Sequence, residues 1–289
     1  MHRHPLISAA ELAARLRGGP SQAPLLLDVR WQLGSGDGYD AYLQGHLPGA
    51  VFVDLERDLS GEPGEDGEGG RHPMPSVDDF ELDMAECGVD NERLVVVYDD
   101  YDSIAAARCW WLLRHFGKYD VVVLDGGLRA WKAERLPVES GVRLVEEGDF
   151  SIRRSRISAL DADQALLYAR EGLLLDARPS DRFEGRNETV DRVAGHIPGA
   201  VNVPARSLVA GDGTMLEPAH LRRVLGEVGV DGERPVAAYC GSGVQASFLA
   251  LAICAAGLGC EIPVYVGSWS DWITDASRPT GSDHTSGVR

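Results

Sequence analysis

The sequence predicts an α/β protein of two tandem domains, each a mainly parallel sheet flanked by helices on both faces. One reason is an internal repeat that extends over most of the chain. Another is the alternation of short, wholly apolar runs with helix-like segments, which is typical of strands buried on both faces of a parallel sheet. The length of 289 residues, of which 44% are hydrophobic and 25% charged, suits two globular domains.

Four features of the first half return in the second half at a nearly constant shift. They are Leu25–Arg30 and Leu173–Arg178, Gly45–Val51 and Gly195–Val201, Val96–Tyr98 and Ala237–Tyr239, and Trp131 and Trp272. A shift of this length indicates a duplicated domain rather than a solenoid of short units. Because His46 and His196 occur in both copies of the second motif, we expect them to be structural residues of a turn.

The first half contains seven predicted elements. A helix begins at Ser8, a good N-cap residue, and runs through Arg17, whereas the apolar run Leu25–Val29 is a buried strand. The other elements are strand Val51–Val53, helix Ser76–Cys87, strand Leu94–Tyr98, helix Ile104–Phe116 (ended by Gly117) and strand Val121–Leu124. The glycine-rich stretch 61–70 lies inside the repeat, so we interpret it as a mobile loop and not as a linker.

The second half contains a similar order of elements. They are helix Ser158–Arg170, strand Leu173–Ala177, helix Pro218–Val228, strand Pro235–Tyr239, helix Ala246–Ala256 (ended by Gly257) and strand Pro263–Val266. A polar stretch separates the two halves. It predicts domains at residues 1–138 and 158–289 that are joined by a linker at 139–157.

The charge of the chain excludes several kinds of partner. The formal net charge of −17 repels nucleic acid and anionic membrane surfaces. No apolar run is long enough to cross a bilayer, and Met1–Pro5 leads into a polar stretch without the apolar region of a signal peptide. We therefore expect a cytoplasmic location. A small anionic substrate would need local positive charge in its binding site.

The chain has five cysteines: Cys87, Cys109, Cys240, Cys254 and Cys260. Their number is odd, their spacing is irregular, and no C-x-x-C pair occurs among them. We therefore expect neither a disulfide scaffold nor a structural zinc site. Four of them are expected to be small buried hydrophobic residues. Cys240 is the exception.

Cys240 follows an apolar strand and precedes Gly241, Ser242, Gly243 and a predicted helix. Backbone N–H groups at the start of a helix favour an anion, so this loop would stabilise a thiolate and the persulfide formed from it. The corresponding residue of the first half is Asp99, and no glycine follows it. We expect the first copy to have lost both the nucleophile and the anion cradle.

Two other interpretations of this loop are weaker. Residues Gly241–Ala246 match the G-x-G-x-x-[GA] pattern of dinucleotide-binding proteins. That pattern opens its domain, however, whereas only about forty residues follow it here. A cysteine-dependent phosphatase would need an arginine where this chain has Ala246. We therefore expect no organic cofactor and no hydrolysis of phosphate esters.

With these motifs in place, residues Pro5–Trp272 resemble the tandem-domain rhodanese family of sulfurtransferases. The loop at Cys240 is similar to that of the 3-mercaptopyruvate sulfurtransferase branch. Thiosulfate sulfurtransferases typically carry positive side chains directly after the cysteine, whereas Gly241 and Ser242 are neutral. Gln245 departs from the threonine that is usual in the family. The resemblance implies a substrate-binding loop that includes Gly241, Gly243, Val244 and Gln245.

The resemblance also implies a partner for the substrate carboxylate. Arg182 matches the arginine that binds this group in the family, and it would supply the local positive charge that the acidic chain requires. The family has a second such arginine, with which neither Arg186 nor Arg192 aligns cleanly, so that role stays open.

A serine-hydrolase-like trio is the third implication of the resemblance. Ser242, Asp54 and His72 match its serine, aspartate and histidine around the catalytic Cys240. An imidazole held by a carboxylate would exchange a proton with the substrate through the serine.

The function implied is that of an enzyme, a sulfurtransferase that needs no metal or organic cofactor. The Cys240 thiolate would take sulfur from a small anionic donor, 3-mercaptopyruvate, and pass it from a persulfide to a thiol, to cyanide or to a thioredoxin-like protein. Two alternatives stay open: a thiosulfate:cyanide sulfurtransferase that uses the same cysteine, and a noncatalytic sulfur-carrier module.

Overall fold

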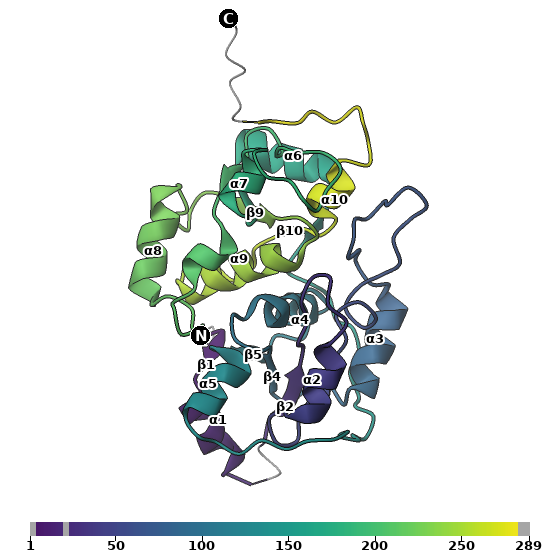
Figure 1. Ribbon diagram of the computed structural model, residues 1–289, viewed down its shortest axis with the longest axis vertical. Helices are drawn as coiled ribbons and strands as arrows, with labels where there is room; N and C mark the ends of the chain where they lie inside the picture. Colours follow the sequence, from purple (N-terminus) through teal and green to yellow (C-terminus); the bar gives the residue numbers. More distant parts are fainter. Residues whose placement is uncertain (1–3, 20–22, 283–289) are drawn as a thin grey trace, which may run out of the picture. The chain divides into compact units, whose positions relative to one another are not determined.

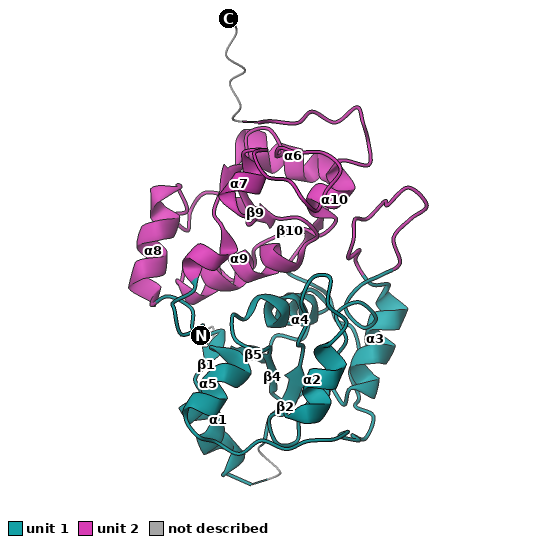
Figure 2. Cartoon of the chain, in the orientation of Figure 1, with its two compact units in different colours: residues 1–61, 75–156, 209–216 teal, residues 62–74, 157–208, 217–289 magenta. Residues whose placement is uncertain are grey.

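The computed structural model describes residues 4–19 and 23–282. Residues 1–3, which contributed to the expectation that a signal peptide is missing, lie outside this range. The chain divides into two compact units, which are described separately (Figure 2). Unit 1 comprises residues 1–61, 75–156 and 209–216, and unit 2 comprises residues 62–74, 157–208 and 217–289.

Unit 1 contains five strands and five helices within the described part of the chain (Figure 1). In chain order they are β1 Leu6–Ile7, α1 Ala9–Leu16, β2 Leu25–Asp28, α2 Gly38–Gln44, β3 Val51–Phe52, α3 Val77–Glu86, β4 Val95–Tyr98, α4 Ile104–His115, β5 Val121–Leu124 and α5 Gly127–Ala133. All strand pairs are parallel, and the order across the sheet is β1-β5-β4-β2-β3.

Within the described residues, unit 2 follows the same plan of five strands and five α-helices, with one short 3-10 helix added. Its elements are β6 Ala159–Leu160, α6 Ala162–Glu171, β7 Leu173–Asp176, α7 Ser180–Phe183, β8 Val201–Asn202, the 3-10 helix η2 Ala205–Leu208, α8 Pro218–Glu227, β9 Val236–Tyr239, α9 Val244–Ala255, β10 Val264–Tyr265 and α10 Ser268–Trp272. The sheet is again parallel, in the order β6-β10-β9-β7-β8. The two sheets are therefore copies of one topology, as the repeat predicts.

The repeated motifs make the same contacts in both units. The Arg30 guanidinium pairs with Asp28 and donates to the Gly45 carbonyl at 2.9 Å. Arg178 does the same with Asp176 and the Gly195 carbonyl, the latter at 2.7 Å. Each ion pair is buried and carries a further hydrogen bond, which is the condition under which two charges are tolerated inside a protein.

His46 and His196 also have equivalent positions. Nδ1 of His46 is 2.9 Å from the Tyr42 carbonyl oxygen, and its ring stacks on that of Tyr42. Nδ1 of His196 is 2.8 Å from the Phe183 carbonyl oxygen, and its ring stacks on that of Phe183. The prediction that both are structural turn residues is confirmed.

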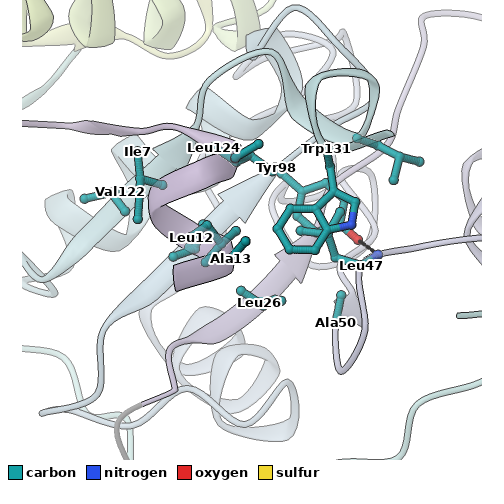
Figure 3. Packing of buried hydrophobic residues seen from close by; sticks show 13 residues of the cluster. Ile7, Leu12, Ala13, Leu26, Leu47, Ala50, Tyr98, Val122, Leu124 and Trp131 are labelled. Atoms are coloured by element: carbon teal, nitrogen blue, oxygen red, sulfur yellow. Dashed lines mark hydrogen bonds between the residues drawn. The ribbon is translucent and has the colours of Figure 1, made fainter. Parts of the chain in front are cut away.

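The core on one face of the unit 1 sheet shows why alternate strand residues must be apolar. Leu26 of β2 and Val122 of β5 lie on the side of the sheet that faces Leu12 and Ala13 of α1 (Figure 3), and Val96 of β4 belongs to the same buried cluster. Trp131 of α5 completes this cluster, and its indole N–H donates to the Pro137 carbonyl at 2.7 Å. In unit 2, Trp272 donates to Pro279 in the same way, at 3.0 Å. Since α4 packs on β4 and β5 as well, helices cover the sheet on both faces.

The predicted strands and helices match the structure to within two residues at most of their ends, with one larger difference. The helix expected from Ser158 begins at Ala162, because Ala159 and Leu160 pair with β10 as the edge strand β6. Its N-cap is Asp161, which forms a reciprocal capping box with Gln164. The elements that the sequence analysis did not include are short: β1, β6, β8, α2, α5, α7, η2 and α10.

The two units do not coincide with consecutive ranges of the sequence. Residues 62–74 of the first repeat belong to unit 2, and residues 209–216 of the second belong to unit 1. Most of the predicted linker also belongs to unit 1, in which Glu139 pairs with His46 and the Gly148 and Phe150 amides donate to backbone carbonyls of the first half. The consecutive bounds 1–138, 139–157 and 158–289 stay a proposal. Among the described residues no helix is both long and apolar enough to span a bilayer.

Candidate active site

Cys240 lies at the turn that joins β9 to α9 in unit 2. It follows Tyr239, the last residue of the strand, and α9 begins at Val244 with Gly243 as its N-cap. The Gly243 N–H donates to Cys240 Sγ at 3.1 Å, and the cysteine is only 2% exposed. Gly243 has φ = +84°, a conformation that residues with a Cβ rarely adopt. The strand-to-helix position predicted for Cys240 is therefore present in the fold.

The short helix α10 is hydrogen-bonded to the backbone of this loop. The Cys240 N–H donates to Ser268 Oγ at 3.0 Å, and that hydroxyl donates to the Tyr265 carbonyl at 2.8 Å. The Trp269 and Ser270 amides donate to the carbonyls of Cys240 and Gly241 at 3.0 and 2.9 Å. The Cys240 backbone is therefore held by hydrogen bonds at both its N–H and its carbonyl, and the Gly243 N–H contacts the sulfur itself.

Ser242 and His72 are brought together from distant parts of the sequence. Ser242 Oγ and His72 Nδ1 are 2.8 Å apart, and both side chains are buried. The loop that carries His72 is attached to α10, since the Gly69 amide donates to Asp271 Oδ1 at 2.8 Å and the Arg71 amide donates to Ser270 Oγ at 3.1 Å. These hydrogen bonds attach the end of the stretch 61–70, which the sequence predicted to be a mobile loop, to α10.

Asp54 lies in unit 1, directly after β3, and is half-buried. Its Oδ1 accepts hydrogen bonds from the amides of Glu56 and Arg57 at 2.9 and 3.3 Å. This carboxylate thus caps the turn that follows the strand. Its assignment to the trio with His72 stays a prediction.

Arg182 is in α7, and its guanidinium approaches the loop at Gly241. A Cβ built on Gly241 would be 3.8 Å from Nη1 and 3.9 Å from Nη2 of Arg182. Nη2 pairs with Asp191 at 2.7 Å, and Nε donates to both oxygens of Glu188 at 3.1 Å. The guanidinium is therefore close to the cysteine loop but is already paired with carboxylates.

The two other candidate arginines have different partners. Arg186 pairs with Glu184 and is exposed, whereas Arg192 donates to the Ile273 carbonyl at 2.6 Å. Of the remaining loop residues, Val244 is buried and Gln245 is half-buried in the first turn of α9.

The expectation that the first copy has lost its anion cradle was wrong. Asp99 follows β4 as Cys240 follows β9, and one of its oxygens accepts from the Tyr101 and Ser103 amides at 3.2 and 3.0 Å. The other accepts from the Ala105 and Ala106 amides at 3.1 and 3.2 Å. The N-cap Ser103 takes the left-handed conformation at φ = 61°, as Gly243 does in the second copy.

The cradle of the first copy is therefore intact and is occupied by a carboxylate of the chain itself. The sequence did not reveal this cradle, because the glycines of the second copy were its expected signal. The donors are backbone amides, which every residue except proline carries. Burial raises the pKa of Asp99 to about 7, against the opposing effect of the amide hydrogen bonds.

The other cysteines differ from Cys240. Cys254 and Cys260 form a disulfide, which corrects the expectation that both are simple buried hydrophobic residues. After α9 ends the chain turns back at Gly257, so the two Cα atoms are 4.4 Å apart and within bonding range. Cys87 and Cys109 are free and buried. Burial raises the pKa of the Cys87 thiol to about 12 and that of the Cys109 thiol well above its usual value.

Three residues near the site were missed by the sequence analysis: Arg71, Glu188 and Asp191. Arg71 directly precedes the predicted site residue His72, and this neighbourhood was the one sign in the sequence that Arg71 lies near the site. Glu188 and Asp191 lie in the loop after α7, where an acidic chain offers many similar carboxylates. Within residues 4–19 and 23–282, no cluster of three or more His, Cys, Asp or Glu side chains is arranged to hold a metal ion.

A cysteine in a strand-to-helix turn, on the second of two copies of one parallel α/β domain, defines the class of protein. The chain belongs to the rhodanese family, because the model of the Rhodanese-like domain matches residues 8–134 and again residues 159–275. The predicted fold class and the predicted family are both confirmed.

The relatives extend over nearly the whole chain. A putative thiosulfate sulfurtransferase SseB of Mycobacterium tuberculosis is 43% identical over 281 residues, which cover 96% of each protein. A probable 3-mercaptopyruvate sulfurtransferase of Pseudomonas aeruginosa is also 43% identical, over 96% of this chain and 98% of its own length. Among solved structures, the 3-mercaptopyruvate sulfurtransferase SseA from Escherichia coli has a TM-score of 0.80 at 32% identity, and the match covers 93% of this chain and all of that one.

Proposed function

We propose that this protein is a sulfurtransferase that takes a sulfur atom from 3-mercaptopyruvate onto Cys240 and passes it to a thiol or to cyanide. The observation that carries the proposal is the Ser242–His72 contact of 2.8 Å beside the cysteine loop. It favours a donor whose leaving group needs a proton, and that requirement separates the two donors under consideration.

With mercaptopyruvate as the donor, the pyruvate fragment leaves as a carbanion equivalent. When the Cys240 thiolate attacks the sulfur of the donor, a new S–S bond forms, the C–S bond breaks, and its electron pair goes to the pyruvate enolate. The enolate must take a proton at carbon to become pyruvate, and the proton on the donor thiol is available for it. A hydroxyl that contacts an imidazole is suited to relay this proton. Thiosulfate instead releases sulfite, a stable anion that needs no proton.

The second half-reaction returns the enzyme to its first state. An acceptor thiolate or cyanide attacks the outer sulfur of the persulfide, and the electron pair of the S–S bond returns to Cys240. No net oxidant or reductant is consumed. Because sulfur resides on the protein between the two steps, the kinetics should be ping-pong.

The loop chemistry also favours a carboxylate donor over a sulfonate dianion. Gly241 and Ser242 bring no positive side chain next to Cys240. Against this, the SseB relative named for thiosulfate and the relative named for mercaptopyruvate are equally similar to this chain. Thiosulfate therefore stays the second candidate donor.

Intact-protein mass after exposure to each donor tests the proposal. We expect one added sulfur atom with mercaptopyruvate, and no adduct in Cys240→Ser. Cys109→Ser is the matched control, because it removes a free buried cysteine and should retain the adduct. The ratio of kcat/KM for the two donors then identifies the preferred one. An adduct that persists without Cys240, or no turnover with either donor, would contradict the proposal.

The location and the natural acceptor rest on the sequence. The cytoplasmic location expected from the sequence stays a proposal, and we propose a small thiol or a thioredoxin-like protein as acceptor from the resemblance to the family.

A further inference from the structure

Two guanidinium groups flank the residue that follows the nucleophile. A Cβ built on Gly241 would be only 2.8 Å from Nη2 of Arg71, and the nearest nitrogen of Arg182 would be 3.8 Å away. Arg71 comes from the loop that carries His72, and Arg182 comes from α7. A side chain at position 241 would displace the end of the Arg71 side chain, so the glycine leaves room for this guanidinium next to the cysteine loop.

One carboxylate joins these two guanidinium groups. Asp191 accepts from Nη1 of Arg71 with one oxygen and from Nη2 of Arg182 with the other. Both side chains at the centre of the cluster, Asp191 and Glu188, are only 3% exposed. Although burial acts in the opposite direction, hydrogen bonds from the Asp191 amide and from Arg182 lower the pKa of Glu188. The carboxylate of Glu188 therefore stays charged beside the site.

The charges in this cluster balance. Arg71 and Arg182 are paired with Asp191 and Glu188, and the neighbouring Arg178 is paired with Asp176. The site nevertheless retains an unused donor, since Nε of Arg71 is buried and has no hydrogen-bond partner. An incoming anion would thus meet two guanidinium groups but little net positive charge.

We propose that Asp191 determines donor specificity, by subtracting one charge from the pair Arg71–Arg182 beside Cys240 and so favouring a singly charged donor over a doubly charged one. This inference rests on the proposed function. The electrostatic energy of an anion scales with its own charge, so a carboxylate held near the donor penalises thiosulfate about twice as much as mercaptopyruvate. In the same arrangement Arg71 offers the donor a second guanidinium beside that of Arg182.

Asp191→Asn is the direct test, because it keeps the shape of the side chain and removes its charge. The rate at which each donor loads sulfur onto Cys240 is measured by intact mass in single turnovers, at low ionic strength. We expect the thiosulfate-to-mercaptopyruvate ratio of loading rates to rise roughly tenfold, the equivalent of about 1.4 kcal/mol for the second negative charge. Added salt should reduce the change.

Arg71→Gln should shift the same ratio in the opposite direction, since it removes a positive charge. If circular dichroism shows that Asp191→Asn does not fold, the shift of the ratio in Arg71→Gln tests the proposal in its place. Glu184→Gln is the matched control: it removes a carboxylate of the same loop whose partner is the exposed Arg186, and the ratio should change by less than about twofold.

A purely structural ion bridge would give a different result. It would lower the loading rates for both donors equally, and an unchanged ratio in a folded variant would overturn the inference. The proposed function fails separately, if the unmodified protein forms no persulfide on Cys240 with either donor.

Discussion

Replacing Ser242 with alanine should slow sulfur transfer from mercaptopyruvate far more than transfer from thiosulfate. The substitution removes the hydroxyl that lies 2.8 Å from His72 Nδ1, where both side chains are almost fully buried. Only the mercaptopyruvate reaction needs a proton delivered to its leaving group. The effect of the substitution should therefore depend on the donor.

The magnitude follows from two contributions. Loss of a buried hydrogen bond costs about 1 kcal/mol and affects both donors alike. Loss of a positioned proton donor costs about 10²–10⁴-fold in rate and affects mercaptopyruvate alone. We therefore expect kcat/KM for mercaptopyruvate to fall about 100-fold or more, and that for thiosulfate to fall by no more than about tenfold.

The assay follows pyruvate release from mercaptopyruvate and sulfite release from thiosulfate, with the same acceptor in both cases. Ser247→Ala is the matched control, because Ser247 is a buried serine of α9, the helix that follows Ser242, and its hydroxyl donates to the Gly243 carbonyl instead of contacting His72. Equal losses with both donors in Ser242→Ala would refute the proton-relay argument.

Three further predictions concern the wider structure. Arg182→Gln removes charge-assisted hydrogen bonds of about 1.5–3 kcal/mol, so KM for mercaptopyruvate should rise roughly 10- to 100-fold in steady-state assays of the folded variant. Because the buried Glu188 and Asp191 lose this partner, the free energy of unfolding should fall as well. An unchanged KM would exclude Arg182 from donor binding. Because burial raises the pKa of Asp99 from 3.8 to about 7, its protonated form stabilises the fold at low pH, and this contribution is lost as pH rises through about 7. Urea titrations should thus show the wild type losing stability relative to Asp99→Asn between about pH 4 and pH 7, and a constant difference would contradict the shift. Reduction of the Cys254–Cys260 disulfide should lower the free energy of unfolding by about 2 kcal/mol, measured with and without reductant, because the closed loop is short.

Features that depend on local pattern could be predicted from the sequence. The four-residue strands β2, β4, β7 and β9 are wholly apolar or end in a repeated motif, so their burial on both faces was visible. Cys240 could be identified because the strand before it and the helix after it are both contiguous in sequence. Two-residue strands such as β1 and β6 carry no such pattern, since their pairing with β5 and β10 alone makes them strands.

The sequence by itself determined that the chain is a duplicated parallel α/β fold and which cysteine follows the buried strand of the second copy. Tertiary structure alone decided which side chains meet that cysteine loop: His72 and Arg71 reach it from a segment far away in the sequence, and Asp191 joins the two arginines. It also decided that the Asp99 carboxylate occupies the amide cradle of the first copy. The physical reason is that periodicity reports only burial along the chain, whereas hydrogen bonds and charge pairs depend on distances that folding alone creates.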